Sequence, residues 1–183
     1  MARIQPLDPQ AATGISKELL DQIAQKNGKT INIQRVLAHS PAALQAYVGI
    51  SGALGQGGLS PQLRERIALV VAQENNCSYC LSAHTFLAGR RGLSDEEILS
   101  ARRGEAEGEK EHAVVTFAQT VVRERANVTE ADLQRLRDAG LSEGDIVEVV
   151  ANVVANIFTN YINHVADTPV DFPLAPAPQT AGR

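Results

Sequence analysis

Both cysteines of the chain lie in one short segment, three residues apart, as Cys77 and Cys80. A helix that begins near Asn75 or Asn76, both suitable N-caps, would place Cys77, Cys80 and His84 on one face. The N-terminus of a helix stabilises a thiolate, and paired cysteines often have a pKa below the free-thiol value of about 8.5. His84 can accept a thiol proton, and a second thiol can capture an oxidised sulfur as a disulfide. The spacing therefore predicts thiol redox chemistry.

Other interpretations of the same residues stay open. A single CxxC is half of a zinc site, but a closed zinc site needs four ligands, and His39, His112 and His164 are scattered along the chain. The cysteines could also be inert core residues. Glu74, three residues before Cys77, either tunes a thiol or simply ends its helix. Redox chemistry remains the leading hypothesis, and we expect neither a metal nor a cofactor.

The composition limits the classes of protein to which the chain can belong. Of 183 residues, 44% are hydrophobic, and the formal net charge is −4. This argues against intrinsic disorder, and two cysteines are too few for a disulfide-stapled scaffold. The low pI of about 5.6 argues against a nucleic-acid partner. No apolar stretch is long enough for a membrane span and none resembles a secretion signal, so we expect a cytoplasmic protein.

Proline placement and cap residues predict the elements that position the cysteines. Residues 62–168 contain no proline, which suits consecutive helices. Ser40, Ser60 and Ser94 are candidate N-caps, while Gly28 and Gly140 suit helix C-termini. Apolar residues recur every three or four positions in the last segment. The predicted helices span 16–27, 41–54, 61–74, 77–89, 94–103, 109–126 and 130–139, followed by a long helix at 143–166.

The remaining segments are predicted to be irregular. Residues 30–33 form the only candidate strand, 52–58 form a glycine-dense loop, and 104–111 form an acidic, solvated linker. Four prolines prevent the tail at 168–183 from being helical throughout, so it is either disordered or packed over a neighbouring subunit. We therefore expect a single all-α domain at 1–167, with its active-site core at about 61–90, and a Pro-rich tail.

The segment Leu63–Thr85 resembles the core of the alkylhydroperoxidase D-like proteins of the carboxymuconolactone decarboxylase superfamily. The matching features are a glutamate twelve residues before the first cysteine, the CxxC pair, and a histidine four residues after the second cysteine. The resemblance implies an all-α helical bundle that assembles as a homo-oligomer, a trimer or hexamer.

The resemblance also implies roles for individual residues. Cys80 would attack a peroxide, Cys77 would donate a proton and then close the disulfide, and His84 and Glu65 would form the proton relay. Tyr79 occupies the position of a second relay histidine. A tyrosine, with a pKa near 10, cannot replace imidazole as a proton shuttle at neutral pH, although it can pack and form hydrogen bonds. Tyr79 and Glu74 are therefore secondary candidates.

The function implied is a thiol-dependent peroxidase, an antioxidant oxidoreductase whose partners are a hydroperoxide substrate and an unidentified thiol or disulfide reductant protein. Three alternatives remain: a protein disulfide oxidoreductase or electron carrier, decarboxylase-like lactone chemistry, and a non-enzymatic zinc-binding helical module. The second needs no dithiol, so the retained CxxC disfavours it.

Overall fold

Nine α-helices and no strands make up the part of the chain that the computed structural model describes, residues 2–176. The predicted all-α fold is therefore confirmed. The helices are α1 (Gly14–Asn27), α2 (Asn32–Leu37), α3 (Pro41–Gly55), α4 (Pro61–Glu74), α5 (Ser78–Arg90), α6 (Asp95–Arg102), α7 (Glu109–Arg123), α8 (Glu130–Asp138) and α9 (Glu143–Ala166).

The helix α4 lies at the centre of the bundle. It packs against α5, α6, α7 and α9, and its residues from Glu65 to Ala72 are all buried. A helix that is buried all round has no solvated face, so even its charged residues must find partners inside the protein. This places Glu65 in the interior.

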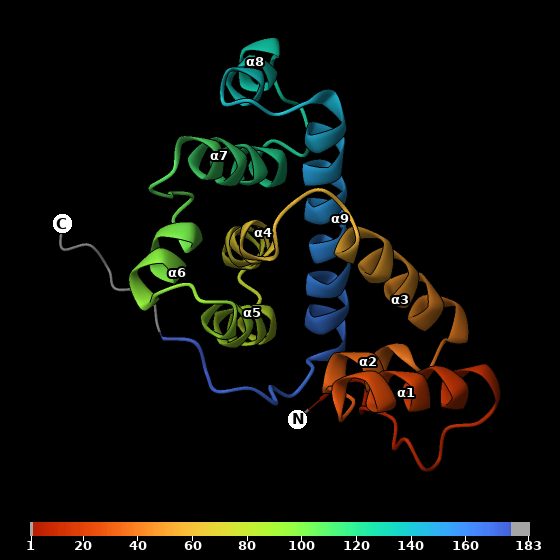
Figure 1. Cartoon of the computed structure of the whole chain (residues 1–183). Helices are drawn as coiled ribbons and strands as arrows, with labels where there is room; N and C mark the ends of the chain where they lie inside the picture. The colour runs from red at the N-terminus through yellow and green to blue at the C-terminus, as the bar shows by residue number, and fades with distance from the viewer. Residues whose placement is uncertain (1, 177–183) are drawn as a thin grey trace.

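The long helix α9 separates two groups of helices, with α4–α7 on one side and α1–α3 on the other (Figure 1). Its apolar residues Ile146, Val149 and Val153 join the core shared with α4, α7 and α8. A second cluster brings residues of α1–α3 together with Cys77, Tyr79 and Cys80. The cysteines therefore lie where the two groups meet. Within the described residues, no helix is sufficiently long and apolar to span a membrane.

The predicted caps account for most helix boundaries. The hydroxyls of Ser40, Ser60 and Ser94 each accept a hydrogen bond from a backbone N–H in the first turn. Gly28 and Gly140 have φ values of 80° and 83°, which suit a residue without a Cβ. These local signals set the boundaries independently of the tertiary contacts.

Two expectations for the irregular segments and one predicted helix end are wrong. The candidate strand at 30–33 runs into α2, which begins at Asn32, because Ile33, Val36 and Leu37 have helical spacing and are buried together. No neighbouring strand exists among the described residues to satisfy the backbone of an isolated strand. The glycine-dense segment 52–58 is helical as far as Gly55. Helix α7 ends at Arg123, short of residue 126.

Residues 167–176 leave the end of α9 and run past α5 toward α6 as an irregular strap (Figure 1). The backbone N–H of Ala175 donates to Ser82 Oγ of α5 at 3.1 Å. A guanidinium nitrogen of Arg102 in α6 donates to the carbonyl of Pro176 at 2.9 Å. This part of the predicted tail therefore packs against its own chain, and residues 177–183 lie outside the described residues.

Candidate functional site

The turn between α4 and α5 places Cys77 at a helix N-terminus. Asn75 ends α4, and Asn76 follows in the left-handed region with a φ of 53°. Cys77 is itself the N-cap of α5, and its sulfur accepts a hydrogen bond from the Cys80 N–H at 3.4 Å. The expectation that Asn75 or Asn76 caps this helix is thus wrong. The sulfur takes the position that a capping oxygen would normally occupy.

The two thiols have different acidities. The pKa of Cys77 is lowered to about 7, chiefly because the Cys80 thiol donates to its sulfur, an effect that burial opposes and the Cys80 N–H reinforces. The pKa of Cys80 is raised, because its thiol proton is engaged in the hydrogen bond to Cys77 and because the thiol is buried. The side-chain amides of Asn163 and Asn160 act in the opposite direction on Cys80. When the pair loses its first proton, the product is therefore a Cys77 thiolate that accepts a hydrogen bond from the Cys80 thiol.

A cavity of about 240 Å³ lies beside the dithiol. Cys80, His84 and Glu65 line this cavity, and Cys77 does not. Other lining residues come from the strap and from α2, α3 and α9; they include Ile33, Tyr47, Ser51, Asn156, Asn163 and Phe172. A small ligand in the cavity would therefore meet the Cys80 sulfur and not that of Cys77.

Glu65 and His84 are in direct contact. The Glu65 carboxylate lies 2.8 Å from His84 Nδ1 through one oxygen and 3.0 Å from an Arg91 guanidinium nitrogen through the other. Only 5% of the Glu65 side chain is exposed, compared with 23% for His84. The carboxylate can hold the imidazole with its Nδ1 proton toward Glu65, which frees Nε2 for proton transfer. Arg91 was not predicted.

Tyr79 anchors the strap to α5. Its hydroxyl donates to Asp171 at 2.7 Å and accepts from the Ile33 N–H at 3.2 Å, while its ring packs edge-to-face on Phe172 at 5.9 Å. Burial, and then the bond to Asp171, raise the pKa of Tyr79. The side chain therefore keeps its proton at neutral pH, and its contacts are those of a packing residue.

Replacing Tyr79 with phenylalanine tests this role. The change leaves the buried Ile33 N–H without an acceptor and removes one donor from Asp171. We expect the free energy of unfolding to fall by about 1–3 kcal/mol in urea titrations. Under the peroxidase function that the resemblance implies, peroxide consumption should remain within about threefold of the unmodified protein, since loss of a proton-transfer group usually costs about a hundredfold or more. A hundredfold loss of rate with unchanged stability would assign Tyr79 to proton transfer.

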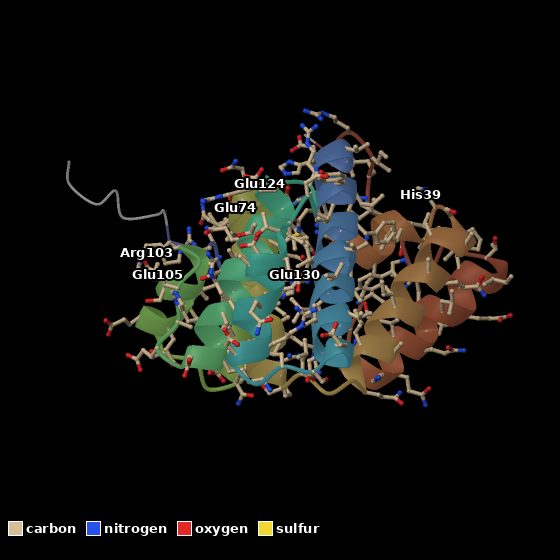
Figure 2. The ribbon with its side chains drawn as sticks, turned by 90° about the horizontal axis from the view of Figure 1, so that it is seen from above. His39, Glu74, Arg103, Glu105, Glu124 and Glu130 are labelled. Atoms are coloured by element: carbon tan, nitrogen blue, oxygen red, sulfur yellow. The ribbon has the colours of Figure 1, made fainter. Side chains whose placement is uncertain are left out.

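Glu74 lies away from the dithiol. Its carboxylate accepts from Arg123 and Gln119 of α7, each at 2.8 Å. Figure 2 shows Glu74 on one side of α9 and His39 on the other. Glu65, rather than Glu74, is the glutamate that the fold brings to the site. Within residues 2–176, no group of three or more His, Cys, Asp and Glu side chains is arranged to hold a metal ion.

The long helix α9 supplies site residues that were not predicted. Asn163 Nδ2 donates to the Cys80 sulfur at 3.2 Å, and Asn160 is fully buried beside it. Asn152, Asn156, Asn160 and Asn163 recur at helical spacing within an otherwise apolar helix. That polar stripe is the signal by which the sequence could have indicated a site-facing surface.

The acidity of Cys77 leads to a prediction about pH. As the pH rises through about 7, the ultraviolet absorbance of a thiolate should appear, because the folded-state pKa lies at that value. In Cys80→Ala the donor to Cys77 is lost, and the midpoint should move toward about 8.5. Cys80→Ser retains an O–H donor and should keep a midpoint nearer 7. Identical midpoints in the two variants would contradict the proposed hydrogen bond.

Comparison with known proteins places this site in context. The sequence model of the carboxymuconolactone decarboxylase family matches residues 41–109. No curated protein matches the sequence.

Solved structures resemble most of the chain at low identity. A structure described as the alkylhydroperoxidase AhpD core, an uncharacterized peroxidase-related protein from Ralstonia eutropha, is 22% identical with a TM-score of 0.81 over 93% of this chain and 92% of that one. An uncharacterized peroxidase-related protein from a Silicibacter species is 23% identical, with a TM-score of 0.79 over 91% and 92%. A cysteine-to-alanine variant of the debrominase Bmp8, in complex with 2,3,4-tribromopyrrole, is 19% identical with a TM-score of 0.78 over 92% and 91%. The expected resemblance is confirmed: the chain carries a carboxymuconolactone decarboxylase family segment on an alkylhydroperoxidase D-like fold.

Proposed function

We propose that this protein is a thiol-dependent peroxidase in which Cys80 is the residue that attacks the peroxide. The observation that carries the proposal is the convergence of Cys80, His84 and Glu65 on one cavity, with Cys77 behind Cys80. A peroxidase needs a sulfur that a small substrate can reach, a group that removes its proton and a proton donor for the leaving oxygen. These residues supply all three.

In the first step, the Cys77 thiolate accepts the proton of the Cys80 thiol to which it is hydrogen-bonded. The Cys80 sulfur attacks the terminal oxygen of the hydroperoxide, so an S–O bond forms and the O–O bond breaks. His84 in its protonated form, held by Glu65, donates a proton to the departing alkoxide. The products are a Cys80 sulfenic acid and an alcohol. The neutral His84 imidazole then regains its proton from solvent.

In the second step, the Cys77 sulfur attacks the Cys80 sulfenic acid and gives up the proton that it accepted in the first step. An S–S bond forms, the S–O bond breaks, and the oxygen takes that proton and leaves as water. The net reaction converts one hydroperoxide and two thiols into an alcohol, water and a disulfide. A dithiol reductant, such as a small redox protein, then restores both thiols by exchange.

A second candidate is reductive dehalogenation, in which the same dithiol supplies two electrons. An aryl bromide and two thiols would give the arene, a disulfide and hydrogen bromide. The rings of Tyr47 and Phe172 in the cavity favour a planar substrate, and the debrominase Bmp8 shares the fold. The peroxidase proposal is preferred because the Glu65–His84 pair suits protonation of an oxygen leaving group.

One experiment distinguishes these functions. The reduced protein receives one equivalent of cumene hydroperoxide, of 2,3,4-tribromopyrrole or of an oxidised protein disulfide, and free thiols are counted. We expect the peroxide to remove both thiols of each chain within seconds, with a mass lower by two hydrogens, and the other two oxidants to act at least about a hundredfold more slowly. Faster thiol loss with the bromopyrrole or the protein disulfide would overturn the peroxidase proposal in favour of that reaction.

We also propose that the protein is a homo-oligomer. Val147, Val154, Tyr161 and Val165 of α9 are between 52% and 68% exposed, and their helical spacing places them along one stripe of the helix. Burying such a stripe against a second copy would be favourable. Light scattering should give a mass of at least twice the 19.6 kDa of one chain. Val154→Glu should lower that mass. A monomer at micromolar concentration would contradict this.

A further inference from the structure

Two asparagines of α9 leave hydrogen-bonding groups unused beside the cysteines. Asn160 is 0% exposed and Asn163 is 5% exposed. Among the described residues, Asn160 Nδ2 and Asn163 Oδ1 have no hydrogen-bond partner. An unsatisfied buried polar group costs about 1–3 kcal/mol, so such atoms are rare in native proteins and need an explanation. One donor and one acceptor therefore remain without a partner, on two amides that both act on Cys80.

The other half of each amide is held in a fixed orientation. Asn160 Oδ1 accepts from Asn75 Nδ2 at 2.9 Å, at the turn that leads to Cys77. Asn163 Nδ2 donates to the Cys80 sulfur at 3.2 Å. Rotating either amide by half a turn would break its existing bond. The free groups are therefore a donor on Asn160 and an acceptor on Asn163.

This pair of groups complements a sulfenic acid. An S–O–H group carries one oxygen that accepts a hydrogen bond and one proton that it donates. The reduced Cys80 thiol, by contrast, donates its hydrogen bond to Cys77 and carries no oxygen that could bond to either amide. We propose that Asn160 and Asn163 form a cradle that receives the oxygen of the Cys80 sulfenic acid. The cradle rests on the proposed peroxidase function, in which that oxygen comes from the hydroperoxide.

The cradle has a consequence for the choice of sulfur. As the S–O bond forms and the O–O bond breaks, the new oxygen can accept from Asn160 Nδ2 while its proton is donated to Asn163 Oδ1. Asn160 Nδ2 gains an oxygen acceptor, and Asn163 Oδ1 gains a donor, only when the oxygen reaches Cys80. The two amides therefore stabilise this product and the transition state leading to it more than they stabilise the thiol. Asn160 and Asn163 are thus positioning residues that direct oxidation to Cys80, although Cys77 is the more acidic thiol.

The test measures which cysteine becomes a sulfenic acid. The unmodified chain receives substoichiometric hydrogen peroxide in excess dimedone, which traps sulfenic acids, and peptide mass spectrometry gives the ratio of Cys80 to Cys77 adducts. We expect Cys80 to dominate. Asn160→Leu removes the free donor without adding a charge, and Asn160→Asp retains the acceptor for Asn75. Each should lower the ratio at least about tenfold, which corresponds to about 1.4 kcal/mol.

A matched control and a second variant keep the test decisive. Asn127→Asp makes the same chemical change at an exposed loop residue and should leave the ratio unchanged. If the Asn160 variants do not fold, Asn163→Asp, which exchanges the donor to Cys80 for an acceptor, should also lower the ratio. An unchanged ratio in a folded variant overturns the cradle while leaving the peroxidase proposal intact. Absence of any adduct and of peroxide consumption in the unmodified chain overturns both.

Discussion

Peroxide consumption is expected to fall at least about a thousandfold in Cys80→Ser. A hydroxyl is a far weaker nucleophile than a thiol, and the cavity offers Cys80 but not Cys77 to the substrate. The rate is measured by the loss of cumene hydroperoxide with dithiothreitol as the reductant. Cys80→Ser is a conservative change in size, and the hydroxyl can still donate to Cys77, so the fold should be retained.

The companion variant Cys77→Ser provides the matched control. It should react with one equivalent of peroxide, more slowly because the base that accepts the Cys80 proton is lost, and stop at a Cys80 sulfenic acid because no second thiol remains to form the disulfide. Mass spectrometry would then find one added oxygen on the chain, whereas Cys80→Ser should gain little. If Cys77→Ser were inert and Cys80→Ser reacted, the assignments of the two cysteines would have to be exchanged.

The roles of the two cysteines need this test because the more acidic sulfur is not the one that a substrate in the cavity can reach. Cys77 has the lower pKa, yet only Cys80 lines the cavity. A thiolate that no substrate reaches acts best as a base, and a neutral thiol beside that base becomes a nucleophile when it transfers its proton. The geometry therefore favours attack by Cys80 with Cys77 as the proton acceptor.

Replacing Glu65 with glutamine is expected to lower the rate about a hundredfold. The uncharged amide still contacts His84 and Arg91, but it no longer stabilises an imidazolium, and it leaves the Arg91 guanidinium without its carboxylate. The loss should appear in kcat/KM for the alkyl hydroperoxide. It should be smaller with a substrate whose leaving group is more acidic and needs less help from a proton donor.

Glu74→Gln is the matched control for this prediction. Glu74 also pairs with an arginine, but its partners Arg123 and Gln119 belong to α7. The change should leave the rate within about twofold and cost at most about 1 kcal/mol of stability, as for a partly exposed ion pair. A larger loss of activity in Glu74→Gln than in Glu65→Gln would falsify the assignment of the relay carboxylate.

Most of the fold could be predicted from local signals. Serine caps, a proline-free run and helical spacing predicted eight of the nine helices, because these signals act within one or two turns. Helix α2 was missed because Asn32–Leu37 is only six residues long, and its apolar residues also suit a strand. The strap was missed because an irregular segment carries no periodic pattern; contacts with distant residues, including Tyr79, Ser82 and Arg102, define its course.

The spacing in the sequence alone determined the dithiol and its histidine, and the resemblance to the alkylhydroperoxidase D-like proteins added Glu65. Only the tertiary structure decided which sulfur faces the cavity, which glutamate meets His84, and that Tyr79 serves as an anchor for Asp171. It also brought Asn160 and Asn163 of α9 to a cysteine some eighty residues earlier in the chain. Spacing along a helix fixes which side chains share a face, whereas the direction of that face and its neighbours depend on how distant helices pack.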